Sequence, residues 1–262
     1  MEKLFDILHE DDELLVINKP AGLVCHPTKN GELSSLIGRA RLHLKVSPPN
    51  LSTLNSQPST TAQPHLVNRL DRETSGVVIV AKNSVVAGEL GKILESRTIE
   101  KEYLAIVHGH MREDHGLIDA PLGKDEYSVV AVKDCVRADG AAAQTEYWME
   151  QRFSRPSTIN SQLSTFSLLR VQPRTGRKHQ IRIHLANLGH AIVGDKIYGG
   201  DEDLYLALVQ QRLTDEQRAR LIFENHALHA RAVRFVWRDE QKEFSCEPEP
   251  WFAAFVGDAS KL

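Results

Sequence analysis

The sequence predicts an α+β protein with a mainly antiparallel sheet. Along its 262 residues, stretches with the alternation or the β-branched composition of strands follow one another, and few segments show helical periodicity. Strands in such succession form meanders, whereas a parallel sheet would place a helix between neighbouring strands. We therefore expect a single domain over residues 1–262, built on one sheet with a few helices.

The individual elements follow from local patterns. An apolar run that ends in the turn sequence Lys19–Gly22 predicts the first strand. The continuous β-branched run at 77–81 predicts a buried strand, and Asn83 or Ser84 can cap the helix after it. The expected order is strand 13–18, helix 34–46, strand 77–81, helix to about 96, strand 99–107, short strands and turns over 115–132, strands 144–149 and 166–171, helix 177–189, extended segment 190–195, helix 204–220 and strand 227–237.

Two segments have low-complexity composition. Residues 47–64 are dominated by Ser, Thr, Pro, Asn and Gln, which cannot form a core. The sequence of Ser52–Thr60 recurs almost unchanged at Ser157–Thr165. We interpret the segments near 47–64 and 155–165 as insertions into surface loops. The alternative, a pair of RNA-contacting loops, is disfavoured because the repeats lack Lys and Arg.

Composition narrows the class of protein. The chain is 41% hydrophobic and 26% charged, as in ordinary globular proteins. No apolar run reaches the 18 residues of a membrane span, and the acidic N-terminus does not resemble a signal peptide. The three cysteines, Cys25, Cys135 and Cys246, form no CxxC pair, so neither a disulfide framework nor a cysteine zinc site is indicated. We expect a cytoplasmic protein without membrane association.

The charge is unevenly distributed. A net charge of −3 argues mildly against a nucleic-acid partner, but a local basic stripe can override the sum. Residues 169–184 contain five cationic side chains and no acid. This segregation suits a protein with one basic face.

The loop that precedes the buried strand contains the strongest candidate for chemistry. Asp71 lies in it between Arg69 and Arg72, and nearby positive charge favours the ionised form of a carboxylate. An ionised carboxylate on a loop held by a rigid strand can act as a nucleophile or a general base. From residue types alone, an ordinary surface aspartate is the more frequent explanation.

Several stretches together resemble the RluA-type pseudouridine synthases, and they occur in the order of that family. The similarity spans roughly residues 5–255, and four ordered motifs rarely coincide by chance. Asn68 stands where many relatives have His. This difference affects the expected geometry of the loop and leaves the assignment of Asp71 unchanged. The matching stretches are Asn18–Gly22 with His26–Pro27, Arg69–Gly76, Lys101–Ala105, Thr175–His184 and, more weakly, Leu228–Ala230.

The resemblance implies a fold and an active site. The fold would be the pseudouridine synthase fold, a mainly antiparallel mixed sheet in two halves with a central catalytic cleft. Asp71 would be the catalytic nucleophile, Tyr103 would stack on the base, and Arg182 would pair with Asp71. Without the resemblance, Tyr103 would be interpreted as strand packing. Because the first strand motif starts by residue 13, we expect no separate N-terminal RNA-binding domain.

Further residues are candidates for substrate binding. Leu228 is expected to line the pocket for the base. Arg69, Arg177 and Lys178 are candidates for phosphate contacts, with solvent-exposed charge as an equally frequent alternative.

The function implied is conversion of specific uridines in structured RNA to pseudouridine, with ribosomal and transfer RNA both open. This isomerisation needs no cofactor or metal, and we expect a monomer that acts on RNA and not on DNA. One alternative is a non-catalytic RNA-binding module that retains the fold, although Asp71, Tyr103 and Arg182 are all present. Another is a base-excising glycosidase, which would release free uracil.

Other chemistries have little support. His179, His184 and His190, and the pair His226 and His229, do not form a recognised zinc pattern. No nucleophile elbow, P-loop or dinucleotide fingerprint occurs. Asp71 and Glu73 lie too close on one loop to face each other across a sugar.

Overall fold

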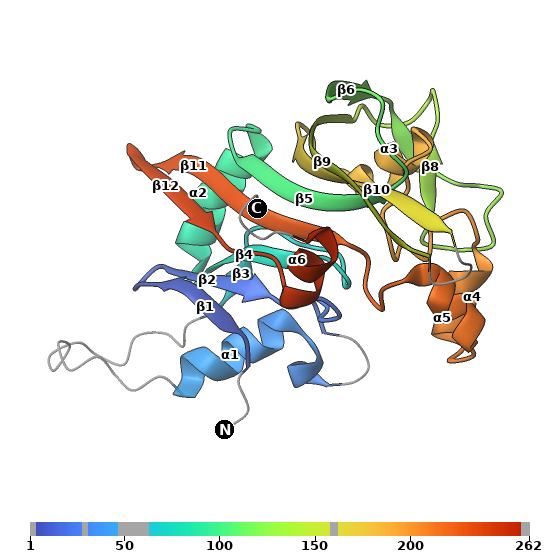
Figure 1. Ribbon diagram of the computed structural model, residues 1–262. Helices are drawn as coiled ribbons and strands as arrows, with labels where there is room; N and C mark the ends of the chain where they lie inside the picture. The colour runs from blue at the N-terminus through green and yellow to red at the C-terminus, as the bar shows by residue number, and fades with distance from the viewer. Residues whose placement is uncertain (1–3, 28–30, 47–62, 158–161, 258–262) are drawn as a thin grey trace, which may run out of the picture. The chain divides into compact units, whose positions relative to one another are not determined.

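The computed structural model describes residues 4–27, 31–46, 63–157 and 162–257 (Figure 1). They fall into two compact units, each with its own hydrophobic core. The first unit comprises residues 1–99 and 232–247, and the second comprises residues 100–231 and 248–262. Strands and helices in each unit confirm the α+β class, and the sheet is mixed but mostly antiparallel.

The first unit is organised around β4 (Ser75–Ala81), whose seven residues are all buried. Its β-branched residues fit a strand that packs on both faces. β2 (Leu14–Lys19) pairs antiparallel with β4, and β1 (Asp6–Glu10) pairs with β2. The short β3 (His65–Leu66) also pairs with β4. The strand next to the predicted catalytic loop is therefore the most enclosed one of this unit.

The helices of the first unit form where the sequence predicted helices. The 3-10 helix η1 (Glu32–Ser34) and α1 (Leu36–Val46) confirm the helix expected from residue 34. In α2 (Ser84–Glu95), the side chain of Asn83 accepts a hydrogen bond from Val86 N at 2.9 Å, so the predicted cap is confirmed. The helix buries Val86 and Leu90 in the core, each contributing on the order of 1.5–3 kcal/mol.

The second unit contains a four-stranded antiparallel arrangement in the order β5, β10, β9, β6. These strands span Glu100–His108, Leu163–Pro173, Gln144–Pro156 and His115–Asp119. β7 (Leu122–Lys124) and β8 (Asp134–Val136) form a separate two-stranded sheet. The sequence predicted an insertion near 155–165. The residues at both ends of this segment extend the hairpin of β9 and β10, and Leu163 lies opposite Pro156. The other predicted insertion lies largely outside the described residues.

Four helices lie in the described part of the second unit. α3 (Gln180–Asn187) occupies most of the predicted helix 177–189, and α6 (Pro250–Val256) was not predicted. The prediction of a single helix at 204–220 was wrong, because the segment forms two helices, α4 (Asp203–Val209) and α5 (Asp215–Leu221).

The break between α4 and α5 has a local cause. Gln211 adopts a left-handed conformation with φ of 56° just after α4. Thr214 and Gln217 then form a capping box, in which each side chain bonds the other residue's backbone N–H. The capping box starts a new helix inside a stretch that is helical by composition throughout.

Strand β11 (Leu228–Trp237) corresponds to the last predicted strand, residues 227–237. Residues up to Arg231 belong to the second unit and those from Ala232 belong to the first. β12 (Glu240–Ser245), which was not predicted, pairs with β11. Within the described part of the chain, no helix is long and apolar enough to cross a membrane.

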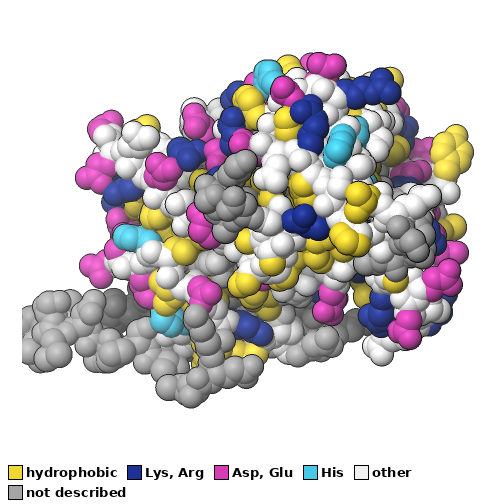
Figure 2. Space-filling view, viewed as in Figure 1, with side chains coloured by type: hydrophobic (Ala, Val, Ile, Leu, Met, Phe, Trp, Pro, Cys, Tyr) yellow, Lys and Arg dark blue, Asp and Glu magenta, His cyan; other side chains and the backbone are white. Residues whose placement is uncertain are grey.

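The basic segment at 169–184 is largely compensated in space. Four of its five cationic side chains have carboxylate partners on neighbouring elements, and on the face shown in Figure 2 acidic and basic side chains are interspersed. A segment without acids in sequence is therefore not a bare basic stripe in the structure. The pairs are Arg170–Glu150, Arg174–Glu146, Lys178–Asp134 and Arg182–Asp195.

Candidate active site

Asp71 lies at the entry to the most buried strand of the first unit. Thr74 N donates to the carbonyl oxygen of Asp71 at 3.2 Å, which closes a turn over Arg72 and Glu73. Asp71 is half-buried, whereas Arg72 is exposed. The chain then continues directly into β4, so a rigid strand fixes the position of the Asp71 backbone.

Asn68 shows how the loop accommodates the departure from its relatives. Its Nδ2 donates to Val77 O at 3.1 Å, and its Oδ1 accepts from Ile79 N at 2.8 Å. One amide group thus supplies both the donor and the acceptor that the β4 backbone requires at this point. The loop is therefore fixed to β4 by side-chain bonds before the chain reaches Asp71.

The N-terminal turn supports the same loop through Lys19, which is fully buried. Its ammonium donates to three carbonyl oxygens, those of Pro20 at 2.9 Å, Leu23 at 2.8 Å and Arg72 at 3.0 Å. Gly22 N also donates to Arg72 O at 2.9 Å. Because a buried charge is costly without hydrogen bonds, these contacts are needed to keep Lys19 inside. They bind the residue that follows Asp71 to the N-terminal motif.

Cys25 makes a matching contact on the other side of Asp71. Its Sγ lies 3.3 Å from Leu70 O as donor and 3.5 Å from Leu70 N as acceptor. Burial raises the pKa of the Cys25 thiol, which favours the neutral form that can both donate and accept. Both neighbours of Asp71 are therefore anchored to the segment 19–25.

Tyr103 lies in β5 of the second unit. Its register partner on β10 is Val171, which pairs in turn with Tyr147 on β9. Tyr103 is half-buried and packs against the core of the unit without being enclosed by it. Stacking on a base requires a ring that the core does not enclose fully, and this half-buried position is compatible with it.

Arg182 is buried in α3 and forms a bidentate ion pair. Its Nε lies 2.7 Å from Asp195 Oδ2, and its Nη2 lies 2.9 Å from Asp195 Oδ1. The guanidinium carbon also lies 5.0 Å from the centre of the Tyr198 ring. A buried guanidinium held on one edge and one face has little rotational freedom.

The Asp195 carboxylate has further bonds. Oδ1 accepts from the backbone N–H groups of Ile197 at 2.9 Å and Tyr198 at 3.0 Å. Burial alone would raise the pKa of Asp195, but Arg182 and these hydrogen bonds hold that pKa well below its usual range. Asp195 is thus ionised at neutral pH.

Sequence reasoning missed Asp195, which it placed in an extended segment without a role. Its only signal was an acidic residue that follows Gly194 and precedes Lys196, in a stretch with few other charges. The pairing expected for Arg182 was with Asp71, in the other unit, and that pairing stays a prediction. Asp195 is a partner of Arg182 that no motif indicated.

A buried polar network fixes the start of α3. Gln180 Nε2 donates to Thr145 Oγ1 at 2.9 Å, and Thr145 Oγ1 lies 2.8 Å from His184 Nδ1. Burial lowers the pKa of His184, so the ring is neutral and donates from Nε2 to Ala120 O at 2.9 Å. Nδ1 then accepts the Thr145 hydroxyl proton. Among the residues that the structure describes, no group of His, Cys, Asp or Glu is arranged to hold a metal ion.

The candidates for phosphate binding differ in their surroundings. Arg177 is exposed, and its Nε donates to Ala142 O at 3.1 Å. Lys178 pairs with Asp134 at 2.8 Å, so an acid of β8 already compensates its charge. Arg69 is exposed on the loop of Asp71. Leu228, the candidate for the base pocket, is 5% exposed and belongs to the core cluster of the second unit.

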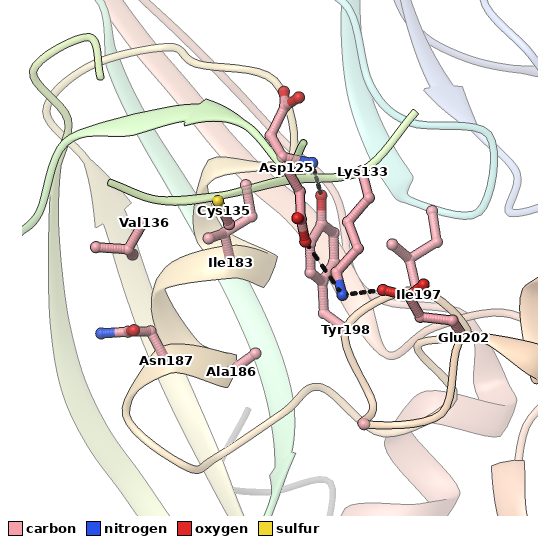
Figure 3. A pocket seen from close by; sticks show the side chains of 12 residues that line it. Asp125, Lys133, Cys135, Val136, Ile183, Ala186, Asn187, Ile197, Tyr198 and Glu202 are labelled. Carbon is pink, nitrogen blue, oxygen red and sulfur yellow. Dashed lines mark hydrogen bonds and ion pairs between the residues drawn. The ribbon is translucent and has the colours of Figure 1, made fainter. Parts of the chain in front are cut away.

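A separate hollow of about 460 Å³ lies in the second unit beside α3 and β8 (Figure 3). Tyr198 lines it and links it to the guanidinium of Arg182. Its charged groups interact with one another, since Lys133 bonds Glu202 and lies 3.6 Å from Asp125. None of the predicted catalytic side chains lines this hollow, so we do not assign it to the reaction.

Comparison with known proteins agrees with this arrangement of motifs. The sequence model of the family described as RNA pseudouridylate synthase matches residues 13–187, which include Asp71, Tyr103 and Arg182. The chain belongs to this family. Among the pseudouridine synthases, one relative is an uncharacterized RNA pseudouridine synthase of Aquifex aeolicus. This chain is 35% identical to it over 74% of this chain and 56% of that protein.

Two further relatives extend the comparison. Ribosomal large subunit pseudouridine synthase D of Xanthomonas campestris is 35% identical over 88% of this chain and 61% of its own length. The solved structure of human RNA pseudouridylate synthase domain containing 4 superimposes with a TM-score of 0.65 at 27% identity, covering 95% of this chain and 90% of that one. The chain spans little more than half the length of the two curated relatives.

Proposed function

We propose that this chain converts specific uridines in RNA to pseudouridine. The observation that carries the proposal is the match to the pseudouridylate synthases over residues 13–187, together with an aspartate loop anchored on both sides of Asp71. The reaction breaks the bond between N1 and C1′, rotates the uracil and joins C5 to C1′. The C5 proton is lost and N1 gains a proton, so no oxidant, metal or cofactor is consumed.

In this proposal Asp71 is the nucleophile, and it attacks either the sugar or the uracil ring. Tyr103 stacks on the base and is the candidate for removing the C5 proton. Arg182 pairs with Asp71 and keeps it charged and oriented. The bond of Arg182 to Asp195 uses Nε and Nη2, and it supports the proposal by fixing the guanidinium in one orientation.

The proposed substrate is the RNA of the large ribosomal subunit, by analogy with relatives that carry that description. A uridine inside a stem is inaccessible, so the target must be unpaired or flipped out. Arg69 and Arg177 are proposed to contact phosphates, and Leu228 to line the base pocket. We further propose that the chain acts as a monomer in the cytoplasm.

Nucleoside analysis tests the proposal. The purified chain is incubated with unmodified large-subunit ribosomal RNA and, separately, with transfer RNA. The RNA is then digested to nucleosides, and pseudouridine is separated from uridine by chromatographic retention, because the two isomers have the same mass. We expect pseudouridine in the ribosomal RNA, with no free uracil. Free uracil would indicate a glycosidase, and tight binding without either product would indicate a non-catalytic RNA-binding module.

A further inference from the structure

Lys101 lies on the same strand as the proposed catalytic tyrosine. It precedes Tyr103 by two residues in β5, and residues two apart in a strand project from the same face. Lys101 and Tyr103 therefore share one face of β5. Neither the family motif nor the proposed reaction has yet assigned Lys101 a task.

The described residues do not compensate the charge of Lys101. Burial lowers the pKa of Lys101, and no charged group opposes that effect. Within the described part of the chain, its ammonium has neither a hydrogen bond nor an ion pair. Other enclosed lysines differ, because Lys19 has three carbonyl partners and Lys196 donates to Glu224 O at 2.6 Å. A partly buried ammonium without a partner costs free energy in the unliganded protein.

The turn before α3 leaves open space beside this ammonium. A Cβ atom added to Gly176 would lie 3.6 Å from Lys101 Nζ and would have no other neighbour within 4 Å. Gly176 is not in the left-handed region, so its backbone does not require glycine. The absence of a side chain at Gly176 therefore keeps one approach to the ammonium free.

We propose that Lys101 and the Gly176 turn form a subsite for a phosphate of the RNA backbone. This inference rests on the proposed function, and it places an anion beside an ammonium for which the described residues supply no counter-charge. A phosphodiester supplies the charge and the hydrogen-bond acceptors that Lys101 lacks. Lys178, one of the phosphate candidates from the sequence, already pairs with Asp134, so its charge is less available to RNA.

Binding measurements with a defined probe test the subsite. Unmodified large-subunit ribosomal RNA, transcribed in vitro, is titrated with wild type and with Lys101→Met at several salt concentrations. We expect Lys101→Met to bind about tenfold more weakly, as for the loss of a charge-assisted hydrogen bond. The slope of log affinity against log salt should fall by about 0.7–0.9, the contribution of one phosphate. Lys101→Arg should restore most of the affinity.

Two further variants provide controls. Lys92→Met removes an exposed lysine of α2 and should leave affinity and slope unchanged. Gly176→Ala places a methyl group beside the ammonium and should weaken binding in the wild-type background but not in Lys101→Met. Such non-additivity is expected when two positions serve one contact. Thermal unfolding should show that Lys101→Met is at least as stable as wild type.

The proposal is overturned if Lys101→Met keeps the affinity and the salt slope of wild type. It is also overturned if the variant binds normally and loses only turnover, because Lys101 would then act on the reacting base. Binding is measured without turnover, so a wild type that binds RNA but forms no pseudouridine would reject the proposed function and leave the test of the subsite intact.

Discussion

Lys19 illustrates how a single buried residue can support a loop that lies far along the chain. Its ammonium is bonded to three carbonyl oxygens, and one of them belongs to Arg72, next to the proposed nucleophile. These bonds offset the cost of burying the charge and join segments more than fifty residues apart. The sequence suggested a plain turn at this motif, because side-chain bonds to distant carbonyls leave no periodic pattern.

Replacing Lys19 with Met should therefore destabilise the protein. The variant removes the charge but leaves buried carbonyl oxygens with fewer partners, at about 1–3 kcal/mol for each unsatisfied group. We expect the free energy of unfolding in urea to fall by about 3 kcal/mol in total. The exposed Lys92→Met should change it by less than about 0.5 kcal/mol. A loss for Lys19→Met no larger than that of the control would show that these bonds contribute nothing to stability.

Asp195 leads to a second prediction at this scale. Asp195→Asn keeps the size of the side chain but leaves the guanidinium of Arg182 without its counter-charge, which costs about 3–5 kcal/mol for a buried pair at neutral pH. The folded-state pKa of Asp195 lies below its ordinary value of 3.8. Its stabilisation is therefore fully present above pH 3.8 and is lost as the pH falls through the folded pKa.

The measurement is the difference in unfolding free energy between wild type and Asp195→Asn as a function of pH. The difference should be constant from pH 7 to about pH 5 and should shrink below the ordinary carboxyl pKa. A difference that grows on acidification would contradict the assigned direction of the pKa shift.

Among the elements, those with strong local signals were predicted and those that depend on partners were not. The buried run of β4 and the Asn83 cap of α2 were evident from residue types. The division of the helix near Thr214 was missed. The residues around the capping box also favour helix, so the sequence is compatible with one continuous helix as well as with two. β12 was missed because its exposed, polar residues become a strand only by pairing with β11.

The candidate site shows the same limit. Motifs indicated Asp71, Tyr103 and Arg182. The structure added Asp195 and Thr145, and it showed that Lys101 has no counter-charge among the described residues. Each of the added residues is defined by what surrounds it in space. Burial, bidentate geometry and missing counter-charges are properties of packing, and sequence spacing does not encode them.

Helix α3 should respond to pH through His184. The pKa of His184 is lowered by burial, so the folded state resists protonation more than the unfolded state does. Stability from this residue is fully present above the ordinary value of 6.5 and is lost as the pH falls below it, with a slope of at most about 1.4 kcal/mol per pH unit.

Urea unfolding between pH 7.5 and 5.5 tests this expectation. His184→Gln should unfold at lower denaturant than wild type at pH 7.5 and should show a shallower pH dependence. If His184→Gln retained the full wild-type slope, the neutral form of His184 in the network would be refuted.

For the whole molecule, the two compact units divide the proposed catalytic residues between them. Asp71 belongs to the first unit, and Tyr103 and Arg182 belong to the second. Neighbouring acids pair with four of the five cations of the basic segment 169–184, so few cations of this segment remain for RNA. We therefore expect affinity for RNA to depend on a small number of uncompensated cations and not on net charge.

The central claim is that Asp71 is the nucleophile of a pseudouridine synthase. Its most direct test is single-turnover release of tritium to water from large-subunit ribosomal RNA that carries tritium at C5 of its uridines. Wild type should release tritium as C5 joins the sugar, whereas Asp71→Asn should bind the same RNA, unfold at the same temperature within a few degrees and release none above background. Release by Asp71→Asn within tenfold of the wild-type rate would contradict the account.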